Sequence, residues 1–315
     1  MRTSKRIILD TDPGIDDALA IILSLRSKEL KVEAITTVSG NVPVRLGTRN
    51  VRRILRLMGL KDLPMIAEGS SLPIKEPPLW TYEIHGKNGL GDLDCFFNDD
   101  SELDEDWIVS RKAIDLIFEM IEKYPNEIII VTLGPLTNIA CAIEKDKDKM
   151  DKVQGIIMMG GAVDVKGNIT PDAEFNIFFD PHAAKIVFDS GIPVIMVGLN
   201  VTRKCILRKE ELVRITEGKR EKIEEFILGA TDRYMEIHLK KTGRAYCYLH
   251  DPLAVGVAID PTLVKMHKMD IDVCIDKKRG KTFCKKKDFQ SEIQVCTDVD
   301  SKRFLRLFYE RVFES

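Results

Sequence analysis

With 315 residues, the chain is long enough to bury a large core, and its 44% hydrophobic and 31% charged residues are typical of a globular protein with a charged surface. Its 48 basic and 50 acidic side chains leave a formal net charge of −2, which argues against a nucleic-acid partner. No apolar stretch approaches the roughly 20 residues that span a bilayer, and no apolar signal segment follows the basic N-terminus. We therefore expect a cytoplasmic protein without a membrane partner. Seven scattered cysteines without a C-x-x-C pair favour reduced thiols.

Short β-branched runs alternate with amphipathic stretches through most of the chain. Nearly continuous apolar runs such as residues 128–131 indicate strands that are buried on both faces of a sheet. The pattern predicts an α/β fold, a single domain with a mostly parallel central sheet flanked by helices. The expected strands are residues 6–10, 32–38, 127–132, 153–159, 193–197, 270–275 and 292–297, and the expected helices are residues 16–27, 44–58, 107–123, 136–144, 181–189 and 302–313.

Two long segments interrupt this alternation. Residues 72–106 contain Trp80, Tyr82, His85 and three glycines, and we interpret them as a loop over the mouth of a pocket. Residues 210–249 begin with a long, strongly charged helical stretch over 210–241, which predicts a helical lid or rim. Because no repeat or linker is present, both segments are interpreted as insertions in one domain that spans residues 1–315.

Polar residues follow several of the predicted strands. In a parallel sheet, binding sites form at the carboxyl ends of the strands, so these residues are expected to share one pocket. They are Asp10, Asp12, Asp16 and Asp17 after the first strand, Asn41 after the second, residues 133–138 after the strand that begins near residue 128, and Met159, Asn168, Glu174 and Asn176 after the strand over 153–159.

Four carboxylates lie within eight residues at the end of the first strand, where Pro13 and Gly14 form the turn into a helix. They repel one another unless a cation lies among them, and oxygen ligands without a nearby Cys or His indicate Ca²⁺ or Mg²⁺. A single Asp here would only cap the helix, and Asp10 is the weakest candidate for a ligand. His250 and Asp251, before an apolar helix, are by themselves also typical of a helix cap.

The chain resembles the inosine–uridine-preferring nucleoside hydrolase family. Residues 10–18 match its D-x-D-P-G-x-D-D-A signature at every fixed position, and further similar motifs occur in order along nearly the whole chain. These motifs are residues 36–41, 85–91, 133–138, 158–161, 173–181 and 250–252.

This resemblance implies calcium-dependent hydrolysis of the N-glycosidic bond of ribonucleosides, which yields ribose and a free base. The positions that match calcium ligands are Asp12, Asp17, Asp251 and the backbone carbonyl of Leu133. Asp12 would also be the general base towards the metal-bound water, and His250 would assist the leaving base. The residues that match ribose-binding or base-binding positions are Asp16, Asn41, His85, Met159, Asn168, Glu174 and Asn176.

The signature histidines imply a pyrimidine-preferring or base-tolerant enzyme acting on uridine, cytidine and inosine. Purine-selective relatives use tryptophans instead, and this chain has only Trp80 and Trp107. From its offset to His250, His238 is a further candidate for contact with the base, although a histidine on a charged helix is usually solvated. We also expect a role in nucleotide salvage and a homo-oligomer, either a tetramer or a dimer.

Two alternatives from other classes fit parts of the sequence. A D-x-D phosphatase would use Asp10 and Asp12, but it leaves residues 133–138 and 250–251 unexplained. A non-catalytic nucleoside-binding protein on the same fold is expected to have lost one of the acids or the histidine, and none is lost here.

Overall fold

The computed structural model describes residues 4–97, 112–218, 221–286 and 291–314. Its centre is an eight-stranded sheet in the order β3-β2-β1-β4-β5-β6-β12-β9, in which only β9 runs antiparallel to its neighbour. This confirms the predicted α/β class with a mostly parallel sheet. The strands are β1 (Lys5–Thr11), β2 (Leu30–Thr37), β3 (Met65–Glu68), β4 (Ile128–Thr132), β5 (Gly155–Met159), β6 (Val194–Val197), β9 (Val264–Lys268) and β12 (Ile293–Val299).

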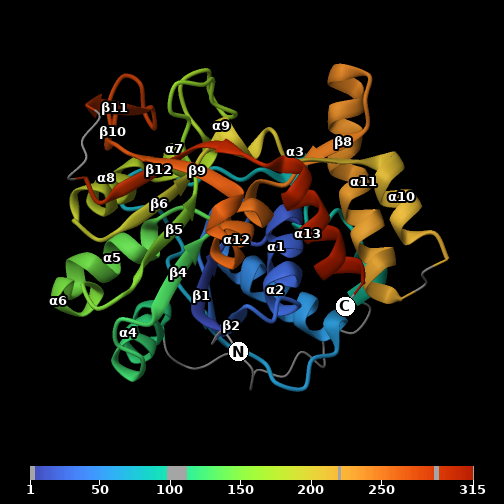
Figure 1. Cartoon of the computed structure of the whole chain (residues 1–315), viewed down its shortest axis with the longest axis horizontal. Coiled ribbons are helices and arrows are strands. Elements are labelled where there is room, and N and C mark those ends of the chain that lie inside the picture. Colours follow the sequence, from blue (N-terminus) through green and yellow to red (C-terminus); the bar gives the residue numbers. More distant parts are fainter. Residues whose placement is uncertain (1–3, 98–111, 219–220, 287–290, 315) are drawn as a thin grey trace.

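Helices cover both faces of the sheet because its strands are apolar on both sides. In β1, Ile7 and Leu9 face one hydrophobic cluster and Ile8 faces the other. The first cluster is built with α1 (Ile15–Leu25), α2 (Val44–Met58), α11 (Lys222–Thr242), α12 (His250–Ile259) and α13 (Ser301–Phe313). The second is built with α4 (Ala113–Lys123), α5 (Thr137–Lys145), α6 (Lys147–Met150) and α8 (Pro181–Asp189), which lie on the left of Figure 1.

The remaining elements are short or lie outside the main sheet. Two antiparallel pairs are β7 (Ile206–Arg208) with β8 (Tyr246–Tyr248), and β10 (Asp270–Val273) with β11 (Thr282–Lys286). The other helices are α3 (Tyr82–His85), η1 (Asp94–Phe97), α7 (Phe175–Phe179), α9 (Leu199–Thr202), α10 (Lys209–Thr216) and η4 (Pro261–Leu263).

The predicted elements before residue 200 are present, with most ends within a few residues of the prediction. The helix expected over 107–123 is α4, which begins at Ala113, and residues 107–111 lie outside the described residues. Strand β3 was not predicted. The charged stretch expected to be helical over 210–241 forms two helices, α10 and α11. The strand expected near 270–275 is β10, and it pairs with β11 rather than with the main sheet.

The packing of α12 against α1 brings distant parts of the chain together. Both helices begin at the same edge of the sheet, and each carries acidic residues in its first turn, Asp16 and Asp17 in α1 and Asp251 in α12. The fold therefore joins carboxylates that are more than 230 residues apart in the sequence.

No helix in the described part of the chain has both the length and the apolar character needed to cross a bilayer. All seven cysteines are free thiols, and three of them, Cys205, Cys247 and Cys296, are buried.

Candidate active site

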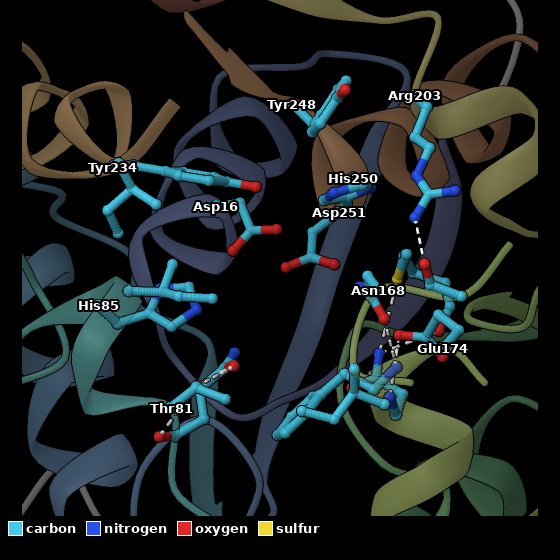
Figure 2. Close-up of a pocket in the computed structure, with 18 of the residues that line it drawn as sticks. Asp16, Thr81, His85, Asn168, Glu174, Arg203, Tyr234, Tyr248, His250 and Asp251 are labelled. Carbon is cyan, nitrogen blue, oxygen red and sulfur yellow. Dashed lines mark hydrogen bonds between the residues drawn. The ribbon is translucent and has the colours of Figure 1, made fainter. Parts of the chain in front are cut away.

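The strand order places β1 beside β4, where the connections of the sheet switch direction. Ligands of doubly wound sheets bind at such a switch point, beyond the carboxyl ends of the strands. A cavity of about 540 Å³ opens there, within the size range of small-molecule sites. Figure 2 shows residues that line it. The sequence-predicted residues among its lining are Asp16, Asn41, His85, Leu133, Met159, Asn168, Glu174, Asn176, His238, His250 and Asp251.

Three carboxylates converge on the floor of this cavity. Asp16, Asp17 and Asp251 each offer an oxygen atom, and these atoms lie within 4.8 Å of one another. All three side chains are buried. In Figure 2 the Asp16 and Asp251 carboxylates point into the same space. The first turns of α1 and α12 thus form one acidic group.

Asp12 lies buried beneath the cavity rather than on its lining. Its Oδ2 accepts a hydrogen bond of 2.6 Å from the backbone N–H of Asn41. Its Oδ1 is buried and has no hydrogen-bond partner among the described residues. A Cβ at Gly40 would come within 2.0 Å of Oδ2, so only glycine permits this close backbone approach. One oxygen of the Asp12 carboxylate is therefore fixed by a hydrogen bond, and the other is available to accept one.

The carboxylates of the floor are electrostatically crowded. Burial and the charge of Asp17 raise the pKa of Asp12 well above its usual range, and the same two causes raise the pKa of Asp16 to about 7. Burial and the charge of Asp16 raise the pKa of Asp251. Within residues 4–97, 112–218, 221–286 and 291–314, no basic side chain forms an ion pair with these four carboxylates. A divalent cation with oxygen ligands would relieve their repulsion, so the donor set fits such an ion.

Asp17 also holds the turn that shapes the floor. Its Oδ2 accepts a hydrogen bond of 3.0 Å from the N–H of Gly14, and its Oδ1 accepts one of 2.5 Å from Thr11 Oγ1. Asp10 has a different environment. It accepts hydrogen bonds of 2.6 Å from Thr36 Oγ1 and 2.7 Å from Asn138 Nδ2, and these bonds tie together strand ends below the acidic group.

The wall opposite α1 carries amide and carboxylate groups fixed by backbone hydrogen bonds. Both oxygens of Glu174 accept bonds from backbone N–H groups, including that of Gly161 at 2.9 Å. Asn176 Nδ2 donates to the Leu133 carbonyl at 2.7 Å and to the Met159 carbonyl at 3.2 Å. The Leu133 carbonyl, a predicted metal ligand, therefore already accepts one hydrogen bond, and its second lone pair is available.

Asn168 and Asn41 are also held in place. Asn168 Oδ1 accepts a hydrogen bond of 2.9 Å from the Phe175 N–H. Asn41 Nδ2 donates to Asp17 at 3.2 Å, and its Oδ1 accepts from Thr81 Oγ1 at 2.9 Å. Asn41 thus connects the acidic floor to the segment that carries His85.

His85 is oriented by the first helix. Its Nδ1 accepts a hydrogen bond of 3.0 Å from the Ile15 N–H at the start of α1. The proton of the neutral ring therefore lies on Nε2, which makes Nε2 a donor. Burial lowers the pKa of His85 to about 4, so the neutral form persists at physiological pH. A Cβ on Gly14 would come within 2.6 Å of Nδ1, so the turn of the signature and this histidine are packed together.

Rings form a continuous row around the other side of the cavity. Ring centroids lie 5.5 Å apart for Tyr234 and His238, 5.2 Å for His238 and Tyr248, and 5.3 Å for Tyr248 and His250. His238, predicted from its offset alone, is half-buried in this row. His250 Nδ1 lies 2.8 Å from Thr202 Oγ1, and burial with the nearby charge of Arg203 lowers the pKa of His250 to about 3.

Several residues at the cavity were not predicted from the sequence, and three of them contact or adjoin predicted site residues. Tyr234 and Arg203 line the cavity, and Thr202 orients His250. Thr202 and Arg203 follow β6, so the rule that sites form at carboxyl ends of strands also applies to them. Tyr234 lies on α11 among charged residues, and no local pattern distinguishes it.

Together these features define a doubly wound α/β protein with an acidic pocket suited to a cation and a small polar ligand. The family model of the inosine-uridine preferring nucleoside hydrolase matches residues 7–306. The chain belongs to this family.

Individual relatives agree with this assignment. Uridine nucleosidase 1 of Arabidopsis thaliana is 38% identical over 267 residues, which cover 84% of this chain and 76% of the relative. The inosine-uridine preferring nucleoside hydrolase of Crithidia fasciculata is 36% identical over 270 residues, which cover 85% and 83%. Among solved structures, a purine-preferring ribonucleoside hydrolase from Gardnerella vaginalis superposes with a TM-score of 0.90 at 34% identity, over 98% of both chains.

Proposed function

We propose that this protein hydrolyses the N-glycosidic bond of ribonucleosides, giving ribose and the free base, and that it uses Ca²⁺. The observation that carries the proposal is a buried floor of four carboxylates beneath a cavity of about 540 Å³, with histidines on its rim. Breaking the bond to the base builds positive charge on the ribose, and fixed carboxylates stabilise such a transition state.

Asp12, Asp17, Asp251 and the Leu133 carbonyl are the groups that we assign to calcium. When bound, the ion would lower the pKa of a coordinated water, orient the ribose hydroxyls and offset the repulsion within the floor. Asp12 is the general base for the attacking water, because its Oδ1 is buried without a hydrogen-bond partner among the described residues.

The polar groups along the cavity bind the sugar in this proposal. Asp16 belongs to the acidic floor, and Asn41 donates a hydrogen bond to Asp17. Asn168 and Glu174 lie across the cavity from Asp16 (Figure 2), and Asn176 and Met159 also line the cavity. Their bonds to backbone groups hold them before the substrate arrives, which reduces the entropic cost of orienting it. Because such a site pairs with the ribose hydroxyls, 2′-deoxyribonucleosides are expected to be poor substrates.

His250 assists the departure of the base, with His85 and His238 as further contacts to it. Since His250 and His85 are neutral, they assist as hydrogen-bond donors through a ring N–H. The uridine nucleosidase and the inosine-uridine preferring hydrolase among the relatives support a base-tolerant or pyrimidine-preferring scope covering uridine, cytidine and inosine. The purine-preferring hydrolase among the similar structures supports only the base-tolerant half of that range. The cytoplasmic location, nucleotide salvage and assembly as a tetramer or dimer stay predictions.

A kinetic panel tests this function. Release of ribose is measured from uridine, cytidine, inosine, adenosine and guanosine, first with added calcium and then with a chelator. We expect turnover of uridine and inosine that is lost on chelation and restored by calcium. Absence of ribose release from all five would favour the non-catalytic alternative, and full activity after complete chelation would contradict the use of a metal.

A further inference from the structure

The residues that line the cavity carry charges of both signs. Besides the buried carboxylates of the floor, the lining includes two cations, Arg203 and Lys241. Within the part of the chain that the structure describes, neither cation forms an ion pair with a carboxylate. The cavity therefore holds positive charges that are not paired within it as well as crowded negative ones.

Arg203 is fixed in this position without losing its charge. Its Nη1 donates to the Lys166 carbonyl at 2.5 Å and its Nη2 to the Gly167 carbonyl at 2.7 Å. In Figure 2 the guanidinium lies beside His250 and above Asn168. Neutral carbonyls orient the guanidinium plane but do not neutralise it, so the positive charge is available to a ligand.

The neighbouring residues place Arg203 on the side of the base. Thr202, the preceding residue, hydrogen-bonds to His250. The charge of Arg203 also acts on Tyr248, the ring that contacts His250. Arg203 thus lies on the side of the cavity that faces the leaving base in the proposed reaction.

The proposed reaction separates positive charge on the ribose from negative charge on the base. The bond between C1′ and the base nitrogen breaks, and its electron pair goes to the nitrogen and spreads over the ring and its carbonyl oxygens. The water oxygen forms the new bond to C1′, and the water proton goes to Asp12. Positive charge therefore develops on the ribose, near the carboxylates, and negative charge develops on the base, near Arg203. Because the carboxylates and Arg203 are already in position, they lower the barrier without first having to reorganise.

We propose that Arg203, with a smaller contribution from Lys241, stabilises the negative charge on the departing base and thereby favours bases rich in carbonyl groups over bases with amino groups. This inference rests on the proposed function. Arginine carries only hydrogen-bond donors, so it complements the carbonyl oxygens of uracil or hypoxanthine and not the exocyclic amino group of cytosine or adenine.

The test compares Arg203→Met with Arg203→Lys and with Lys204→Met as a matched control. Lys204 is the adjacent cation, but it does not line the cavity and pairs with Asp298 at 2.9 Å. The kcat and KM values are measured on uridine and on 5-fluorouridine, whose base leaves more readily as an anion. Cytidine serves as the substrate with an amino base.

For Arg203→Met, kcat on uridine should fall roughly 10- to 100-fold, less than the loss for a buried oxyanion-hole donor because Arg203 is half-exposed. The loss of kcat caused by Arg203→Met should be smaller on 5-fluorouridine and on cytidine. Arg203→Lys should keep most of the wild-type dependence of kcat on the leaving base. Lys204→Met should behave as wild type. An equal loss on all three substrates would show that Arg203 only holds residues 166–167, and it would overturn the inference.

Lys241→Met keeps the inference testable if Arg203→Met does not fold, because Lys241 is exposed and its replacement leaves the core intact. The uridine to 5-fluorouridine ratio of kcat should then fall in the same direction by a smaller factor, and an unchanged ratio for Lys241→Met would overturn the inference. A wild-type protein that releases ribose from no nucleoside would overturn the proposed function, and with it this inference, before any variant is made.

Discussion

The floor and the rim of the cavity are built in different ways. The floor residues come from ends of sheet strands and from the first turns of α1 and α12, and Asp12, Asp17 and Asp251 are almost completely buried. The rim residues come mostly from α3, α11 and β8, outside the main sheet, with Arg203 at the end of α9 and His250 at the start of α12, and His238 and Lys241 are partly or fully exposed. Rigid elements suit the chemical step, whereas exposed elements can change with little cost to the fold. Substitutions in the floor should therefore mainly lower the rate of the chemical step, whereas substitutions in the rim should have smaller effects and mainly change the choice of base.

The largest effect is expected from Asp12→Asn on the floor. The substitution keeps the shape of the side chain and removes its capacity to accept a proton, so kcat should fall about 1000-fold or more, with the melting temperature little changed. Asp10→Asn is the matched control, since Asp10 is equally buried but, unlike Asp12, its pKa is not raised by the charges of Asp16 and Asp17. Wild-type turnover in Asp12→Asn would remove Asp12 from the mechanism.

Chelation of divalent ions should follow in size. If the floor holds calcium, removing it costs several kcal/mol of transition-state stabilisation, or at least about 100-fold in kcat. The melting temperature should also fall, because an ion that binds only the folded state stabilises it and the bare carboxylates repel one another. Calorimetry and turnover are measured after chelation and after addition of Ca²⁺ or Mg²⁺. A melting temperature that is insensitive to both ions would contradict the metal assignment.

Gly14→Ala tests the contact between the two regions. The new Cβ would lie 2.6 Å from His85 Nδ1, so the ring must move away from the Ile15 N–H. We expect a loss of about 1–3 kcal/mol in the free energy of unfolding and roughly a 10-fold loss in kcat/KM. In an His85→Ala background the same substitution should cost much less stability. Equal costs in both backgrounds would show that the strain arises elsewhere.

The smallest effect is expected from His238→Ala on the rim. Loss of one ring contact should change the ratio of kcat/KM between uridine and inosine by about 2- to 10-fold, with the melting temperature unchanged. Leu239→Ala is the control, since Leu239 is 47% exposed and does not line the cavity. An identical ratio in the two variants would leave His238 without a role in the choice of base.

The same contrast explains how much was predictable from the sequence. Three of the four floor carboxylates, Asp12, Asp16 and Asp17, lie within residues 10–17. The end of a strand, a Pro-Gly turn and the start of a helix give strong local signals there. The sheet followed from long apolar strands. Strand β3 was missed because four residues at a sheet edge are too few to show a period. The division between α10 and α11 was not predicted, because charged residues continue up to the break.

The rim was predictable only in part because its contacts are formed by tertiary structure. Arg203 owes its position to carbonyls 36 and 37 residues earlier in the chain, and no local pattern signals such a contact. His238 was singled out by its distance in sequence from His250, but the row of rings around it depends on β8 lying beside α11.

The hydrogen bond between the Ile15 N–H and His85 has a consequence for engineering. A designer who replaces the segment around His85 with one from another protein, to change the base that is accepted, also removes the acceptor for the first N–H of α1. The transplanted segment must supply a new acceptor of similar size against Gly14, or the helix that carries Asp16 and Asp17 loses its anchor. The exchangeable module therefore comprises the turn at residues 13–15 together with the segment at 81–91, and exchanging either one alone should impair both base choice and catalysis.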